Sequence, residues 1–153
     1  MPPWVRCGDG SIPAVFSWKR PGNLGVRNAR LAPCKRTPNC VSSQADPADA
    51  EHYVAPIPFK GDAIAAVRRV VLGIARTTII RTETNYLYAE FRTPLMRYVD
   101  DVEFFHDDQA GMIHVRSASR LGRRDFGVNR RRVEELRSRL SSSAARPPRG
   151  DVP

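Results

Sequence analysis

Four short stretches between residues 77 and 119 show the residue patterns of β-strands, and they restrict the fold more than any other part of the chain. The predicted strands cover residues 77–81, 86–92, 98–105 and 112–119. In the second of them, Leu87, Ala89 and Phe91 alternate with tyrosine and glutamate residues, which is the period of a strand with one buried face. Because only short connections separate the four strands, an antiparallel meander is the simplest topology.

An amphipathic helix is predicted on each side of these strands. Asp62 is placed to cap the first helix and Asn129 the second. The apolar faces, at helical spacing, are Ile64, Val67, Val71 and Ile74 in the first helix and Val133, Leu136 and Leu140 in the second. The predicted fold is therefore a two-layer α+β domain, an antiparallel sheet of about four strands with two helices packed on one face. The residues expected in its core are Val67, Val71, Phe91, Val115 and Leu136.

The rest of the chain shows no sustained periodicity. Residues 1–32 are rich in proline, glycine and arginine and are predicted to form an irregular arm that packs Val15, Phe16 and Trp18 on the domain. Residues 33–140 are predicted to form the single α+β domain, with an extended path before the first helix because prolines recur there. Residues 141–153 are predicted to be a disordered tail by composition.

The most basic stretch, residues 115–132, reads VRSASRLGRRDFGVNRRR and lies in a chain of formal net charge +9. With Asn129 as the cap, Arg130, Arg131 and Arg132 fall in the first turn of the second helix. Cations at that end oppose the helix dipole by about 0.3–1 kcal/mol each when exposed. Negative charge is therefore expected nearby, either from carboxylates of the protein, which we favour, or from a bound anion.

The two alternatives define two groups of candidate residues. The candidate anion site consists of Arg116, Arg120, Asn129, Arg130 and Arg132. The candidate structural network consists of Asp100, Asp101 and Asp125. Because Asp100 and Asp101 are neighbours on a strand, they should point to opposite faces and are not expected to act as a paired-carboxylate catalyst.

The hairpin formed by residues 98–119 decides which charges meet. With its turn centred on Gln109, Arg116 lies opposite Val102 and shares a strand face with Arg120. A slip of one residue would exchange these partners, so the pairing of aspartates with arginines stays open at this point.

Cys34 and Cys40 lie in the loop PCKRTPNC. If the protein is exported, a disulfide is expected there and would add roughly 2 kcal/mol to its stability, whereas in the cytoplasm the thiols would be reduced. The spacing does not suit a zinc site, and no metal or other cofactor is expected. Cys40 with His52 as its base, or Ser42, could serve as the nucleophile of a hydrolase, but no third orienting group is evident.

Three separated motifs resemble one known family. They are LAPCKRTPNCVSSQA, YVDDVEFF and VRSASRLGRRDFGVNRRRVEELR, and the resemblance covers residues 23–140. In these parts the chain is similar to the bacterial and plastid proteins grouped as domain of unknown function 1499. The resemblance implies one small α+β domain and, for many relatives, an envelope or plastid location. It implies no activity.

The chain as it stands indicates a cytoplasmic protein, because no apolar run approaches the ~20 residues of a membrane span and no signal peptide is recognisable. The resemblance leaves an envelope or periplasmic location open. We predict a non-catalytic binding or envelope-associated domain whose arginine-rich motif holds an anionic small molecule, a lipid head group or an acidic protein. The alternatives are a nucleic-acid-binding protein, which would lack the interleaved aromatic residues of that class, and the hydrolase. The oligomeric state is left open.

Overall fold

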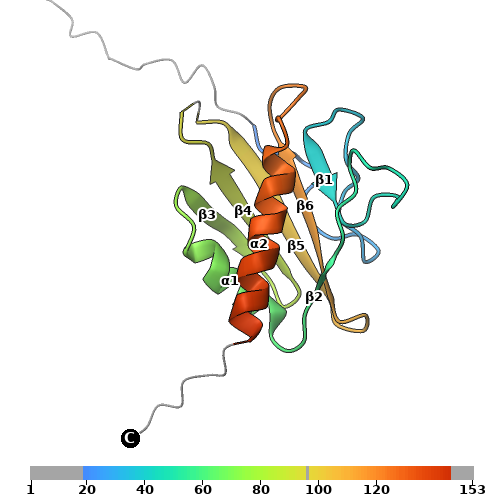
Figure 1. Ribbon diagram of the computed structural model, residues 1–153, viewed down its shortest axis with the longest axis vertical. Coiled ribbons are helices and arrows are strands. Elements are labelled where there is room, and N and C mark those ends of the chain that lie inside the picture. The colour runs from blue at the N-terminus through green and yellow to red at the C-terminus, as the bar shows by residue number, and fades with distance from the viewer. Residues whose placement is uncertain (1–18, 96, 146–153) are drawn as a thin grey trace, which may run out of the picture.

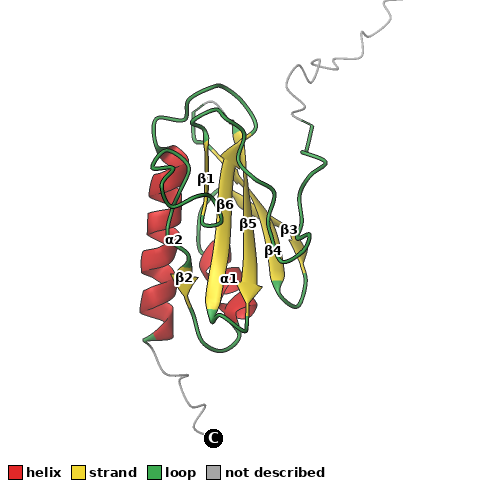
Figure 2. Cartoon of the chain, turned by 90° about the vertical axis from the view of Figure 1, so that its right-hand side faces the viewer, coloured by secondary structure: helices red, strands yellow, loops and turns green. Residues whose placement is uncertain are grey.

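Three long strands form the middle of the sheet around which the structure is built. The computed structural model describes residues 19–95 and 97–145. In chain order its elements are β1 (Cys40–Ser42), β2 (Ile57–Pro58), α1 (Ala63–Leu72), β3 (Thr77–Thr82), β4 (Tyr86–Arg92), β5 (Val99–Asp107), β6 (Met112–Ser119) and α2 (Val128–Ala144). The strands form one sheet in the order β1-β6-β5-β4-β3, with β2 also paired to β6, and both helices cover the same face (Figures 1 and 2).

The predicted α+β fold is confirmed, and the strand count is higher than expected. All the named strand pairs are antiparallel, and β3 to β6 form the predicted meander. The two additional strands, β1 and β2, come from the proline-rich stretch before α1 and are only three and two residues long. Pro58 can lie in β2 because a short strand at the edge of the sheet needs few backbone donors.

Helix α1 begins as predicted, but the start of α2 differs from the prediction. The Asp62 carboxylate accepts a hydrogen bond from Ala65 N at 3.0 Å and caps α1. Asn129 is not the N-cap of α2, because the helix begins one residue before it, at Val128. Gly127 takes the N-cap position with φ 77°, a left-handed conformation that glycine adopts without steric cost. This turn places Asp125 over the helix end, where its carboxylate accepts from Asn129 N at 2.9 Å.

The C-terminal end of α2 also differs from the prediction. The helix continues through Ala144, so residues 141–144, which were predicted to begin the tail, are helical. The hydroxyls of Ser141 and Ser142 donate to the carbonyls of Arg137 and Ser138 at 2.9 and 3.0 Å. These local bonds let a serine run remain helical instead of competing with the helix. The predicted tail from residue 146 onward lies outside the described residues.

The main core lies between the helices and the sheet. All five residues expected in the core are buried, and Val67, Val71 and Val115 are fully enclosed. Around them lie buried residues from α2 and the central strands, among them Leu87, Phe104, Ile113, Val133, Leu136 and Leu140. Burying each such side chain contributes about 1.5–3 kcal/mol. Because this term is large, the spacing of apolar residues in the sequence was enough to predict the helices and the central strands.

The opposite face of the sheet is covered as well, so the prediction that β4 is half-buried was wrong. Tyr86 and Tyr88 are buried there in a second cluster with Leu31 and Phe105. Gln44 holds the covering segment, because its side chain accepts from Leu31 N at 2.8 Å and donates to Ala29 O at 3.0 Å. Val15, Phe16 and Trp18, predicted to pack on the domain, lie outside the described residues.

Neither helix in the described part of the chain is long and apolar enough to cross a membrane.

Candidate functional site

The face of the sheet opposite the helices carries alternating charged side chains. Glu103 on β5 is paired with Arg116 on β6, and Asp101 with Ala118. The predicted register was one residue out, because it placed Val102 opposite Arg116. The turn lies between Asp107 and Met112 and is centred between residues 109 and 110, half a residue beyond Gln109. As predicted, Asp100 and Asp101 point to opposite faces, since their partners lie on opposite sides of the sheet.

Arg120 joins three acidic or phenolic groups on this face. Its Nε and Nη2 donate to Asp101 at 2.9 and 2.6 Å, and Nη2 also donates to Glu90 Oε1 at 2.6 Å and to the Tyr88 hydroxyl at 2.9 Å. The hydrogen bond to Asp101 raises the pKa of Arg120 above its usual value. Burial alone would raise the pKa of Glu90, but the hydrogen bonds from Arg120 and Arg20 lower it below the usual value. Arg120 and Glu90 are therefore charged at neutral pH.

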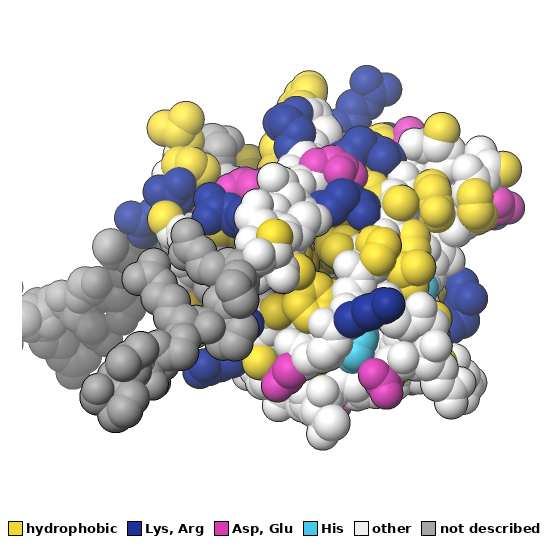
Figure 3. Space-filling model, turned by 60° about the horizontal axis from the view of Figure 1, so that its bottom comes forward, with side chains coloured by type: hydrophobic (Ala, Val, Ile, Leu, Met, Phe, Trp, Pro, Cys, Tyr) yellow, Lys and Arg dark blue, Asp and Glu magenta, His cyan; other side chains and the backbone are white. Residues whose placement is uncertain are grey.

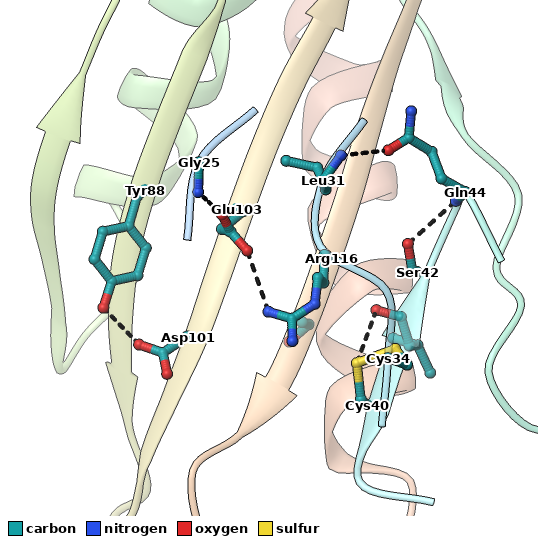
Figure 4. A network of polar contacts seen from close by, with 12 residues as sticks. Gly25, Leu31, Cys34, Cys40, Ser42, Gln44, Tyr88, Asp101, Glu103 and Arg116 are labelled. Atoms are coloured by element: carbon teal, nitrogen blue, oxygen red, sulfur yellow. Dashed lines mark hydrogen bonds and ion pairs between the residues drawn. A yellow bond between two sulfur atoms is a disulfide. The ribbon is translucent and has the colours of Figure 1, made fainter. Parts of the chain in front are cut away.

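Arg116 is held less completely than Arg120. Glu103, which is fully buried, accepts from Gly25 N at 2.8 Å and from Arg116 Nη1 at 3.1 Å (Figure 4). It also accepts from the Tyr86 hydroxyl at 2.8 Å. Burial raises the pKa of Tyr86, so this hydroxyl remains a donor. Among the described residues the Arg116 guanidinium donates only the one hydrogen bond, and its Nε is buried without an acceptor.

A cavity of about 520 Å³ opens beside these two arginines. Its charged lining residues are Lys19, Lys35, Arg116, Arg120 and Asp101. Asn39, Thr37 and Ser119 add polar groups, and Cys40 and Ala118 also line it. The arrangement can hold a small polar molecule with negative charge, because four cationic side chains and one carboxylate surround the space.

The other candidate residues lie on the helix side of the sheet. Arg132 Nη2 donates to Asp100 Oδ2 at 2.6 Å, and its Nη1 donates to Asn129 Oδ1 at 2.8 Å. Arg130 donates to backbone carbonyls, including Tyr53 O at 2.8 Å. The structure therefore brings Arg116 and Arg120 to one cavity and places Asn129, Arg130 and Arg132 elsewhere.

The first turn of α2 is compensated by groups of the protein. Arg131 Nη1 donates to Phe126 O at 2.9 Å, and Arg132 is paired with Asp100 as above. Asp125 supplies negative charge at the helix end through its hydrogen bonds from Gly127 N and Asn129 N, both at 2.9 Å. Burial alone would raise the pKa of Asp125, but the hydrogen bonds from Asn129 and Gly127 lower it below its usual value.

The residues considered for nucleophilic catalysis have other partners. Cys34 and Cys40 form a disulfide, so Cys40 carries no thiol in this structure. Such a bond persists in oxidising compartments and is reduced in the cytoplasm. Ser42 Oγ accepts from Gln44 N at 3.2 Å (Figure 4). The described residues contain no group of three histidine, cysteine or acidic side chains placed to hold a metal ion.

Two further polar pairs lie near β1. His52 Nδ1 is 2.8 Å from Asp49 Oδ2, and its Nε2 is 3.2 Å from Thr37 O in the disulfide loop. Ser43 Oγ is 3.2 Å from His114 Nδ1, but the same oxygen accepts from Val115 N at 2.9 Å and the serine is buried. Ser43 therefore acts as a structural bridge between β1 and β6.

The two histidines predict opposite effects of pH on stability. Burial alone would lower the pKa of His52, but the hydrogen bonds to Asp49 and Thr37 O raise it above the usual value. The contribution of His52 to stability is then fully present below pH ~6.5 and is lost as pH rises through the folded-state pKa. We expect the stability difference between wild type and His52→Gln, measured by urea denaturation across pH 5–9, to be largest at the acidic end.

His114 provides the matched control. Burial lowers its pKa, so its contribution to stability is present above pH ~6.5 and decreases as pH falls through the folded-state pKa. His114→Gln should therefore become less harmful, relative to wild type, as the solution is acidified. If the stability loss changed with pH in the same way for both variants, the contacts of His52 and His114 would not be what sets their folded-state pKa values.

Several residues of this site were not among the sequence candidates. They are Glu90, Glu103, Tyr86, Tyr88, Lys19 and Lys35. The alternation in β4 and β5 places the first four on one face, and this signal was available, but the face was taken to be exposed to solvent. No sequence pattern marked Lys19 and Lys35 as site residues, because they reach the cavity only through the way the covering segment and the disulfide loop fold.

The chain matches the family described as protein of unknown function (DUF1499) over residues 30–140. No curated protein and no solved structure matched it. The family match covers more than half of the chain and includes α1, all the strands, most of α2, and both Arg116 and Arg120. The chain therefore belongs to the DUF1499 family.

Proposed function

We propose that this chain is a non-catalytic binding domain that holds a small anionic group, a carboxylate or a phosphate, in the cavity beside Arg116 and Arg120. The observation that carries the proposal is the incompletely bonded guanidinium of Arg116, which lines this cavity.

Arg116 supports the proposal through the donors it leaves unused. It is 5% exposed, and among the described residues it donates only to Glu103. A buried donor without an acceptor costs about 1–3 kcal/mol. A ligand oxygen that reached the guanidinium could offset this cost, because guanidinium groups bind carboxylates and phosphates through several donors at once.

The charge around the cavity also supports an anion. Arg116 and Arg120 are balanced by the buried carboxylates of Glu103, Asp101 and Glu90. Lys19 and Lys35 are exposed and have no carboxylate partner among the described residues. No carboxylate among the described residues balances their positive charge, and a bound anion would balance it.

The same contacts give less support to the other two functions. A nucleic-acid-binding surface needs arginines that are free to reach phosphates. Within the arginine-rich stretch Arg123 and Arg124 are exposed, but Arg120 and Arg132 are engaged in buried ion pairs, which leaves fewer phosphate contacts than the composition suggests. A hydrolase needs an activated nucleophile, but Cys40 is bonded to Cys34 and Ser42 already accepts a backbone hydrogen bond.

The test is a thermal-unfolding series with inorganic phosphate and with succinate, each compared with chloride at equal ionic strength. At ten times its Kd, a ligand adds about 1.4 kcal/mol to stability, or about 3–6 °C in Tm. We expect such a rise for at least one of the two anions. Isothermal titration then gives the Kd, which Lys35→Ala should weaken about threefold to tenfold by removing one charged contact.

Lys60→Ala is the matched control, because Lys60 is also an exposed lysine but does not line the cavity. It should leave the anion affinity unchanged. Arg116→Lys keeps the positive charge beside Glu103 but removes the planar donor set, so it should reduce the response while the protein stays folded. Equal responses in Lys35→Ala and Lys60→Ala, or no rise in Tm with either anion, would contradict the proposal.

A further inference from the structure

Two loops at one end of the sheet expose large apolar side chains. Leu95, between β4 and β5, is 94% exposed, and Phe126, between β6 and α2, is 86% exposed. A hydrogen bond from Arg120 N to Val99 O at 3.2 Å ties the ends of the two loops together. Figure 1 shows both loops at the end of the sheet where α2 begins.

Four arginines lie in these two loops or at their ends. Arg92, Arg97, Arg123 and Arg124 are exposed, and none of their guanidinium groups makes an ion pair or hydrogen bond with the described residues. The nearest acidic residue in these loops, Asp125, is occupied by Gly127 N and Asn129 N. On the face shown in Figure 3, by contrast, basic and acidic side chains are interspersed.

The backbone of each loop holds its tip in an unusual conformation. Arg97 and Phe126 have φ 52° and 54°, in the left-handed region that non-glycine residues rarely adopt. Phe126 is fixed further because its carbonyl accepts from Arg131 Nη1 at 2.9 Å. The exposed phenyl ring is therefore presented by a constrained turn, and strained backbone of this kind gathers at functional positions.

We propose that these loop tips, Arg92, Leu95, Arg97, Arg123, Arg124 and Phe126, dock on an anionic lipid surface. Two separate apolar tips set among guanidinium groups suit a bilayer interface, where single side chains enter the boundary of the acyl chains while arginines contact the head groups. A stable protein interface instead buries about 800 Å² on each partner, whereas these two loops offer two highly exposed apolar side chains. The proposal does not depend on the cavity.

Vesicle co-sedimentation tests the proposal directly, with vesicles of phosphatidylcholine alone and vesicles that also contain phosphatidylglycerol. We expect binding only when phosphatidylglycerol is present, and weaker binding as salt is added. Each basic residue near an anionic surface strengthens binding about fivefold, so Arg123→Gln with Arg124→Gln should weaken it about 25-fold. Phe126→Asn should also weaken binding, while asparagine tolerates the left-handed backbone.

A control double variant on α1 distinguishes docking by the loop tips from attraction of the vesicles by the overall positive charge of the protein. Arg68→Gln with Arg69→Gln removes the same charge from exposed positions on α1 and should change binding less than threefold. Lys35→Ala should leave vesicle binding unchanged, so failure here is distinct from failure of the cavity proposal. Equal losses in the two double variants, or no binding to either vesicle, would overturn the proposal. Self-association that requires Phe126, without vesicle binding, would assign the tips to a second copy of the chain.

Discussion

Replacing Arg120 with alanine is expected to lower the free energy of unfolding by about 3–5 kcal/mol. Asp101 and Glu90 are buried and both are paired with the Arg120 guanidinium, and Glu90 is also paired with the half-exposed Arg20. Without it, two carboxylates would remain close together in a region with little water. Urea denaturation at neutral pH measures the loss directly.

Arg139→Ala is the comparison for the Arg120 variant. Arg139 pairs with Glu135 across one turn of α2 at 2.8 Å, but both side chains are about half exposed. Its removal should cost about 0.3–0.5 kcal/mol, because surface pairs of this kind contribute little. Similar losses in the two variants would show that the charges around Arg120 are solvated.

A combined variant identifies the cause of the Arg120 effect. If the cost arises from uncompensated carboxylates, adding Asp101→Asn and Glu90→Gln to Arg120→Ala should recover part of the lost stability. If it arises from lost packing of the arginine side chain, the additional changes should recover nothing. The size of the recovery measures how much of the network is electrostatic.

Asn129→Ala is expected to cost about 3 kcal/mol or more, well above the ~1 kcal/mol typical of an N-cap residue. The Asn129 amide is fully buried and accepts from Ser117 Oγ at 2.5 Å. It also donates to Asn39 O at 3.1 Å and to Ser119 Oγ at 2.8 Å, which joins α2 to β6 and to the residue before β1. Truncation would leave several buried polar groups without partners.

Asp125→Ala separates the two roles at this helix end. Asp125 supplies the capping contacts to Gly127 N and Asn129 N, so its removal should cost about 1 kcal/mol. Urea denaturation of both variants gives the two values under the same conditions. A loss below that of Asp125→Ala in the Asn129 variant would show that the buried bonds contribute little.

The charged face explains how a small domain can keep a polar cavity. Buried ion pairs seldom add net stability, because removing charges from water costs about as much as pairing them returns. Here Glu103 accepts three hydrogen bonds and Arg120 donates several, so most of the buried groups are satisfied. Arg116 is the exception, and it faces the cavity to which we assign the anion.

The sequence by itself located both helices, the strands β3 to β6 and the main core. The bounds of β4 and β6 match the predicted ranges, and Asp62 caps α1 as expected. Val67, Val71 and Leu136 are buried where the helical period placed them. These features depend on residues near one another in the chain, so hydrophobic spacing and side-chain chemistry reveal them directly.

Only the tertiary structure decided which charges meet. A difference of one residue in the hairpin exchanges Val102 for Glu103 opposite Arg116, and the local sequence of the turn did not distinguish the two registers. Asn129 became a buried link because Gly127 allowed α2 to begin earlier. The cavity exists because residues 19–23 and the disulfide loop fold over a face that its tyrosine, glutamate and arginine pattern marked as exposed. Burial of that face depends on contacts between distant segments, and a periodic pattern within one strand carries no information about them.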